Sequence, residues 1–408
     1  MGIEERDAAR ELFPPMPLLD TTGGPDVVGT QDTVDVLVDA AATIRGYMLA
    51  FPTPKLAARM AHQFDKHLTR LFPGPRRFHF LLEGDVPATK RHERQLRSQA
   101  RHAGLRLRGI DFAAPALALA GAPPALRRAA EALAGPGRAA ADVPLREAVA
   151  WLVARGAAAV ADAADDGADA ALQKELVHQI MPELERICLG RALALAGEAT
   201  AVAVDDADLP PEGEAKALPY ARRLGRPCIF VGNDTDVFII ALLQVPRFAD
   251  HPPVYYHDIA RTRMQKHPYM VDLVGCVRAL PAGGAAPADR ALALLLCGND
   301  YVPSPDGTRM TLCRLARKRT RTPDTYDAAY QLVAATAGDA GRITDLVATR
   351  FDAKAAYERP HVEEYVKRAL VATRYYAAAS AAEVPPPDVW TAHGWRGAGV
   401  ANVVANMN

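Results

Sequence analysis

Short apolar runs alternate along the chain with longer stretches of helical spacing. Five of these runs have the length and β-branched composition of buried strands: 34–38, 78–82, 201–204, 228–231 and 254–256. The first is followed by a stretch of helical spacing from about Ala40 to Phe51. Strands that alternate with helices predict an α/β fold, in which a central, mostly parallel sheet is wrapped by helices.

The composition changes between Gly104 and Gly197, where Ala, Leu, Arg and Asp dominate and Pro and Gly interrupt the pattern. We interpret this stretch as a helical insertion with mobile joints. Domains of about 100–200 residues suggest two or three domains, or one large domain with insertions. The predicted segments are the first part of the core, the Ala-rich insertion, the second part of the core and a helical C-terminal region: 1–103, 104–197, 198–300 and 301–408.

The overall charge is balanced, with 48 Lys and Arg against 48 Asp and Glu. Nucleic-acid binding, if present, must therefore use local basic patches. The five cysteines are widely scattered, which is typical of reduced thiols in an intracellular protein. The charged start from Met1 to Pro14 does not look like a secretory segment, and Pro, Arg or Asp interrupts the apolar stretches. We expect no membrane span.

Acidic residues occur where the predicted strands end, or at the start or end of the helices that adjoin them. Seven carboxylates share such positions: Asp39, Glu83, Glu212, Glu214, Asp234, Asp236 and Asp300. Because the carboxyl ends of parallel strands form the ligand-binding crevice of an open sheet, we expect these acids to converge on one edge. Any one of them alone is more simply explained as a helix cap or a solvated turn residue.

The negative charges of several neighbouring carboxylates must be compensated. Two carboxylates about 4 Å apart repel by about 4 kcal/mol at an effective dielectric constant near 20. The crevice must therefore protonate some of them or bind a cation. All-oxygen ligands suit Mg²⁺ or Mn²⁺, and two such ions about 3.5–4 Å apart can promote phosphodiester hydrolysis. The acids therefore favour a site for two divalent cations.

Basic residues follow the second predicted strand. Seven Lys and Arg residues against one Glu lie between Lys90 and Arg108. Four of them recur on one helical face: Lys90, Arg94, Arg97 and Arg101. Lys90 and Arg97 could grip a phosphate near the metals.

A second basic cluster includes Arg314, Arg317 and Lys318, and it could meet a duplex backbone. The alternative for both clusters is a solvated basic surface.

Several sequence blocks together resemble the flap-endonuclease/XPG superfamily of metal-dependent 5′ nucleases, which is built on a PIN-like domain. The blocks are the opening Met1-Gly2-Ile3 and the segments 36–40, 80–87, 212–215, 233–236 and 297–301. The resemblance covers roughly residues 1–100 and 199–320. It implies that the seven acids are metal ligands, that Lys90 and Arg97 are catalytic, and that Gly2, Arg94 and Arg101 contact nucleic acid.

The chain also departs from the family pattern. The Gly-x-Gly-Pro-x-x-Ala block expected soon after Asp300 is replaced by the segment 302–309, which has one Gly. The C-terminus shows no sliding-clamp motif. With its long insertion, the chain looks most similar to the flap-endonuclease-like proteins of large DNA viruses, such as the poxvirus type. The segment 298–303 also resembles the related 5′→3′ exoribonucleases.

The resemblance implies a structure-specific nuclease that acts on DNA with a 5′ flap, a nick or a free 5′ end in replication, repair or recombination. Its cofactors would be two Mg²⁺ or Mn²⁺ ions, and its location the nucleus or a viral replication site. The first segment would include the start of a basic helical arch, and residues 301–408 a duplex-binding part. Two alternatives remain open: an RNA-directed 5′→3′ exoribonuclease, and an inactive nucleic-acid-binding relic of the fold.

Two further features have structural interpretations. We predict that His257-Asp258 forms a turn or helix cap after the fifth strand. We also expect Tyr375, Tyr376, Trp390 and Trp395 to dock the C-terminal region on the core rather than to stack on bases.

Overall fold

The computed structural model describes residues 6–16, 34–39, 76–82, 201–204, 206–258, 269–298, 302, 310–350, 359–386 and 389. By contacts the chain divides into two units: a first unit of residues 1–19, 83–93 and 205–408, and a second unit of residues 20–82 and 94–204. The predicted helix at 40–51 and the predicted insertion at 104–197 lie outside the described residues. The division of the chain into the four predicted segments stays a prediction.

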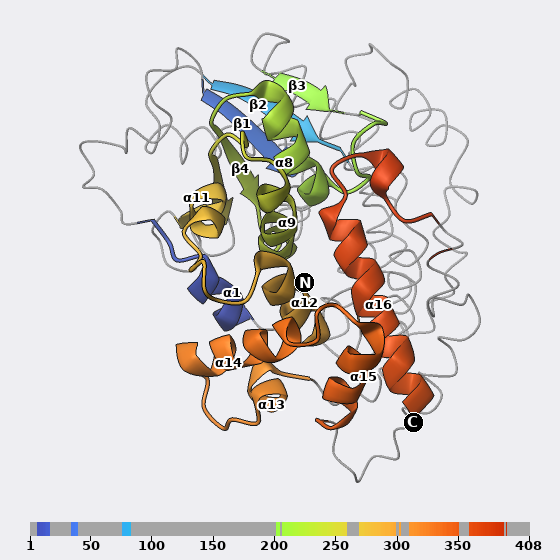
Figure 1. The fold of residues 1–408 in the computed structure, drawn as a ribbon. Coiled ribbons are helices and arrows are strands. Elements are labelled where there is room, and N and C mark those ends of the chain that lie inside the picture. The colour runs from blue at the N-terminus through green and yellow to red at the C-terminus, as the bar shows by residue number, and fades with distance from the viewer. Residues whose placement is uncertain are drawn as a thin grey trace, which may run out of the picture. The chain divides into compact units, whose positions relative to one another are not determined.

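Three strands of the second unit pair in parallel (Figure 1). They are β1 (Val34–Asp39), β2 (Arg76–Leu81) and β3 (Ala201–Val204), and β2 pairs with both of the others. All six residues of β1 are buried, as expected for a strand of a covered parallel sheet. These three strands confirm the first three predicted runs.

Three strands of the first unit also pair with one another. β4 (Cys228–Gly232) is parallel to β5 (Val254–Asp258), and the short β6 (Met270–Asp272) is antiparallel to β5. The fourth and fifth predicted runs are therefore confirmed, and β6 is an addition. Across the described strands the pairing is mostly parallel, which gives the chain an α/β character.

Helix α9 (Asp236–Gln244) connects β4 to β5 and is buried along its whole length. An apolar surface on all sides is expected for a helix enclosed by other elements. It contacts α8 (Gly213–Leu224), α11 (Leu273–Arg278), α12 (Pro287–Leu296) and α16 (Arg359–Ala377). The Phe238 ring of α9 stacks on Phe13, which follows α1 (Arg6–Leu12), with ring centroids 4.7 Å apart. This packing makes α9 the centre of the first unit.

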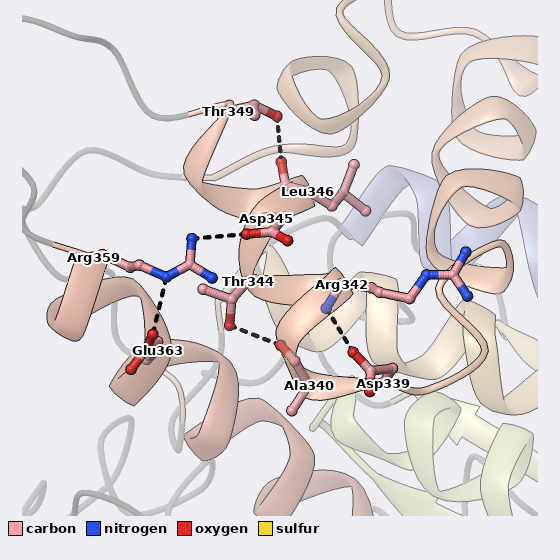
Figure 2. Close-up of polar contacts among 9 residues, drawn as sticks. All are labelled: Asp339, Ala340, Arg342, Thr344, Asp345, Leu346, Thr349, Arg359 and Glu363. Atoms are coloured by element: carbon pink, nitrogen blue, oxygen red, sulfur yellow. Dashed lines mark hydrogen bonds and ion pairs between the residues drawn. The ribbon is translucent and has the colours of Figure 1, made fainter.

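Further helices of the first unit are α13 (Leu312–Ala316), α14 (Pro323–Ala334) and α15 (Ala340–Ala348), together with the short 3₁₀ turns η4 (Val245–Arg247) and η5 (Ala381–Glu383). Figure 2 shows how α15 meets α16: the Arg359 guanidinium joins Asp345 of α15 to Glu363 of α16. None of the helices in the described part of the chain has the length and hydrophobicity needed to cross a membrane.

Candidate functional site

The carboxyl ends of β4 and β5 lie at one edge of their sheet. In the parallel register, Gly232 is the partner of Asp258, so both strands end at the same level. The chain leaves β4 through Asn233 and enters α9 at Asp236. Crevices outside the carboxyl ends of parallel strands are the usual ligand sites of α/β sheets, so this edge is the candidate site of the first unit.

The turn between β4 and α9 is held by hydrogen bonds from three directions. The Asp236 amide donates to Oδ1 of Asp234 at 3.2 Å, within the turn itself. The Tyr256 hydroxyl of β5 donates to the Asp234 carbonyl oxygen at 2.9 Å. The Tyr376 hydroxyl of α16 donates to Oδ2 of Asp236. Both aspartates of the predicted metal-binding pair are therefore fixed by groups from other elements.

The two aspartates differ in exposure. Asp236 is 3% exposed, whereas Asp234 is half-buried. Asp236 lies in the first turn of α9, where the partial positive charge of the helix N-terminus stabilises a carboxylate. The pair thus offers one enclosed and one more accessible carboxylate at the same turn.

The predicted acids Glu212 and Glu214 lie at the start of α8, as the sequence indicated. Glu212 is the N-cap residue and Glu214 is in the first turn, and both are buried. Lys216 is buried in the same turn, and its amide donates to the Glu212 carbonyl at 3.0 Å. Burying a charged group is costly unless an opposite charge or hydrogen bonds compensate it. Lys216 was not predicted, since nothing in the local pattern distinguishes it from a solvated lysine.

Asp39 occupies the equivalent position in the second unit. It is the last residue of β1 rather than the residue after it, it is buried, and Leu81 of β2 is its register partner. Asp39 therefore lies where β1 and β2 both end, as predicted. Glu83, which comes two residues after Leu81, is outside the described residues.

The remaining predicted site residues are either outside the described part of the chain or belong to the second basic cluster. Several lie outside the described residues: Gly2, Glu83, Lys90, Arg94, Arg97, Arg101 and Asp300.

The second basic cluster is described. Arg314 is half-buried in α13, and Lys318 is exposed. The Arg317 guanidinium donates to the Thr349 carbonyl at 3.2 Å, so this side chain joins α13 to the end of α15.

Among the residues that the structure describes, no three or more His, Cys, Asp or Glu side chains are grouped as a metal ion would require. Two of the predicted ligands, Glu83 and Asp300, are not among these residues. The convergence of the seven acids therefore stays a prediction.

The prediction for His257-Asp258 was wrong. These residues form neither a turn nor a cap but the last two positions of β5, and both are buried. The strand continues through them because β5 has neighbours on both sides, with His257 opposite Met270 of β6 and Asp258 beside Gly232 of β4. Asp258 is therefore a further acid at the candidate edge. We would have included Asp258 among the predicted site acids if the fifth predicted strand had been extended from residue 256 to residue 258.

Neither models of known protein families nor curated proteins match the chain. The fold and the site therefore identify the general class of the protein but no family. It is an α/β protein in which two parallel strands, β1 and β5, end in the buried aspartates Asp39 and Asp258.

Proposed function

We propose that the protein is a metal-dependent, structure-specific 5′ nuclease of the flap-endonuclease/XPG type that hydrolyses phosphodiester bonds in DNA. One observation carries the proposal: Asp234 and Asp236 lie at the carboxyl edge of β4 and β5, where hydrogen bonds from two other elements hold them. The burial of Asp39 supports it, because a third predicted ligand also lies at the carboxyl end of a parallel strand, as the last residue of β1.

The donor set fits hard divalent cations. Asp234 and Asp236 supply carboxylate oxygens, which Mg²⁺ and Mn²⁺ prefer. In the proposal two ions are held by these two together with Asp39, Glu83, Glu212, Glu214 and Asp300. Such ions, when bound, supply an activated water and stabilise the leaving oxygen.

The basic residues have separate roles in this proposal. Lys90 and Arg97 neutralise the charge that grows on the scissile phosphate, and the product keeps a 5′-phosphate. Gly2, Arg94 and Arg101 contact the strand that carries the 5′ end. Lys318 contacts the duplex, with Arg314 and Arg317 beside it. The substrate is DNA with a 5′ flap, a nick or a free 5′ end, as arises in replication, repair and recombination.

The test is cleavage of end-labelled flap, nicked and single-stranded DNA, and of matched RNA flaps, with and without Mg²⁺ or Mn²⁺. We expect metal-dependent cutting of the DNA flap, which an Asp234→Ala/Asp236→Ala variant loses. Asp250→Ala is the control, because this carboxylate is exposed and precedes β5, at the opposite end of that strand from the β4–α9 turn. Cleavage that survives the double substitution, or no cleavage of any substrate, would contradict the proposal. Cutting of RNA alone would replace the DNA assignment.

A further inference from the structure

Helix α16 contributes a side chain to the candidate site from far along the chain. The Tyr376 hydroxyl donates a hydrogen bond to Oδ2 of Asp236 at 2.5 Å, although 140 residues separate the two. Neither group is open to solvent, since Tyr376 is 0% and Asp236 is 3% exposed. Water therefore does not compete freely for this contact.

Tyr376 is fixed along its whole length. Its backbone carbonyl accepts a hydrogen bond from Nε2 of Gln244, the last residue of α9, at 3.1 Å. Its hydroxyl reaches Asp236, the first residue of the same helix. Side chains from both ends of α9 thus hold the tyrosine, and the Tyr375 ring packs against its ring at a centroid distance of 5.5 Å. A hydroxyl held in this way defines the orientation of the carboxylate that it contacts.

We infer that Tyr376 is a positioning residue, which orients the Asp236 carboxylate for binding a divalent cation. The inference rests on the proposed function. A neutral phenol suits this role, because it donates one hydrogen bond to Oδ2 and leaves the negative charge of the carboxylate in place. Outer-shell donors of this kind hold metal-ligating carboxylates in one orientation, and their loss weakens metal binding about 10- to 100-fold.

The experiment compares Mn²⁺ binding by calorimetry in the full-length protein and in Tyr376→Phe, which lacks only the hydroxyl. We expect the dissociation constant for Mn²⁺ to rise about 10- to 100-fold. Cleavage by the variant should recover when Mn²⁺ is raised by the same factor, which a general loss of packing would not produce. Tyr330→Phe is the matched control, since it removes a hydroxyl from a tyrosine that is equally buried but belongs to α14. Its Mn²⁺ affinity should match that of the wild type.

A double-mutant cycle tests whether Tyr376 acts through Asp236. Asp236→Asn should weaken Mn²⁺ binding by itself, and adding Tyr376→Phe should cause no further loss. If the loss of Mn²⁺ affinity in the double variant equals the product of the losses in the two single variants, the two residues act independently and the inference is overturned. If Tyr376→Phe melts too low to be measured, 4-aminophenylalanine at position 376 keeps a donor on the ring. Its loss of Mn²⁺ affinity should stay below the roughly 10-fold loss expected without a donor, and a larger loss would count against the inference.

Mn²⁺ binding and cleavage by the wild-type protein distinguish a failure of the nuclease proposal from a failure of the role proposed for Tyr376. If it neither binds Mn²⁺ nor cleaves any substrate, the nuclease proposal fails and the role of Tyr376 fails with it. If it binds Mn²⁺ and Asp236→Asn weakens that binding while Tyr376→Phe does not, only the role of Tyr376 is overturned.

Discussion

The side-chain amide of Gln244 donates a hydrogen bond to the backbone carbonyl of Tyr376, and it also donates to that of Ala378 at 2.8 Å. Arg247 donates to the carbonyl of Ala377, which lies between them. The last carbonyls of a helix have no partner within the helix itself. Here the C-terminal end of α16 obtains its partners from the end of α9 and from η4, and the arginine also complements the helix dipole. These bonds fasten α16 to the central helix.

Gln244→Leu should destabilise the first unit. The substitution replaces the polar amide by an apolar side chain of similar size, and it leaves two buried carbonyls at the end of α16 without their donor. The expected loss is about 2–3 kcal/mol in the free energy of unfolding, measured by urea denaturation. Gln331→Leu, at an exposed position of α14, should change stability by less than about 0.5 kcal/mol. Equal effects at the two glutamines would show that the bonds to α16 contribute nothing.

Asp339→Ala should weaken α15. Figure 2 shows the Asp339 carboxylate accepting a hydrogen bond from the Arg342 amide, at 2.8 Å, in the position of an N-cap. Losing an N-cap acceptor costs about 1 kcal/mol. Asp339→Asn retains an acceptor oxygen and should stay close to the wild type. The prediction is wrong if alanine and asparagine give the same midpoint in urea.

His251 should make stability depend on pH in mildly acidic solution. Its ring is buried, and this burial lowers its pKa, with the Arg278 and Arg222 charges acting in the same direction. The Pro252 carbonyl, 2.9 Å from Nδ1, partly opposes the shift. Because the folded-state pKa lies below the unfolded value of about 6.5, the unfolded chain binds a proton that the folded chain does not.

The free energy of unfolding should therefore fall as the pH drops through about 6.5 and continue to fall until the lower folded-state pKa is reached. Above about 6.5 both states are neutral at this ring, so His251 adds no pH dependence there. His251→Asn cannot take up the proton, and its stability should change less between about pH 7 and pH 5. Urea titrations at several pH values measure this, and identical slopes for the two proteins would exclude His251 as the cause.

Divalent metal should raise the melting temperature if the nuclease proposal is correct. A ligand that binds only the folded state at 100 times its dissociation constant adds about 2.7 kcal/mol of stability. We expect Mn²⁺ to raise the melting temperature of the wild type and of Asp250→Ala. The shift should shrink in Asp234→Ala/Asp236→Ala. A shift that is unchanged in the double variant would place the bound metal elsewhere.

The strands could be predicted because their signal is local. In β4, for example, the predicted run from Cys228 to Val231 is a continuous series of buried apolar residues. β6 has three residues, and its pairing with β5 defines it rather than a pattern of its own. The same pairing carries β5 through His257 and Asp258, which look like turn residues in isolation.

The candidate site was only partly visible in the sequence. Asp234 and Asp236 are visible because they adjoin a strand, but the groups that hold them are not. Tyr256 and Tyr376 lie 22 and 140 residues away from the aspartates they contact, and only the folded chain brings them there. The sequence did predict that Tyr375 and Tyr376 dock on the core, and their complete burial confirms it. Trp390 and Trp395 lie outside the described residues.

The shortness of β6 affects how the protein behaves at high concentration. An open strand edge can recruit a strand from another molecule, and long edges are the most prone to such aggregation. β6 has only three residues, and the Met16 amide already occupies the Met270 carbonyl at 2.8 Å. Few backbone groups therefore remain along β6 to template intermolecular β-pairing, so this strand should not seed fibrils or domain-swapped oligomers.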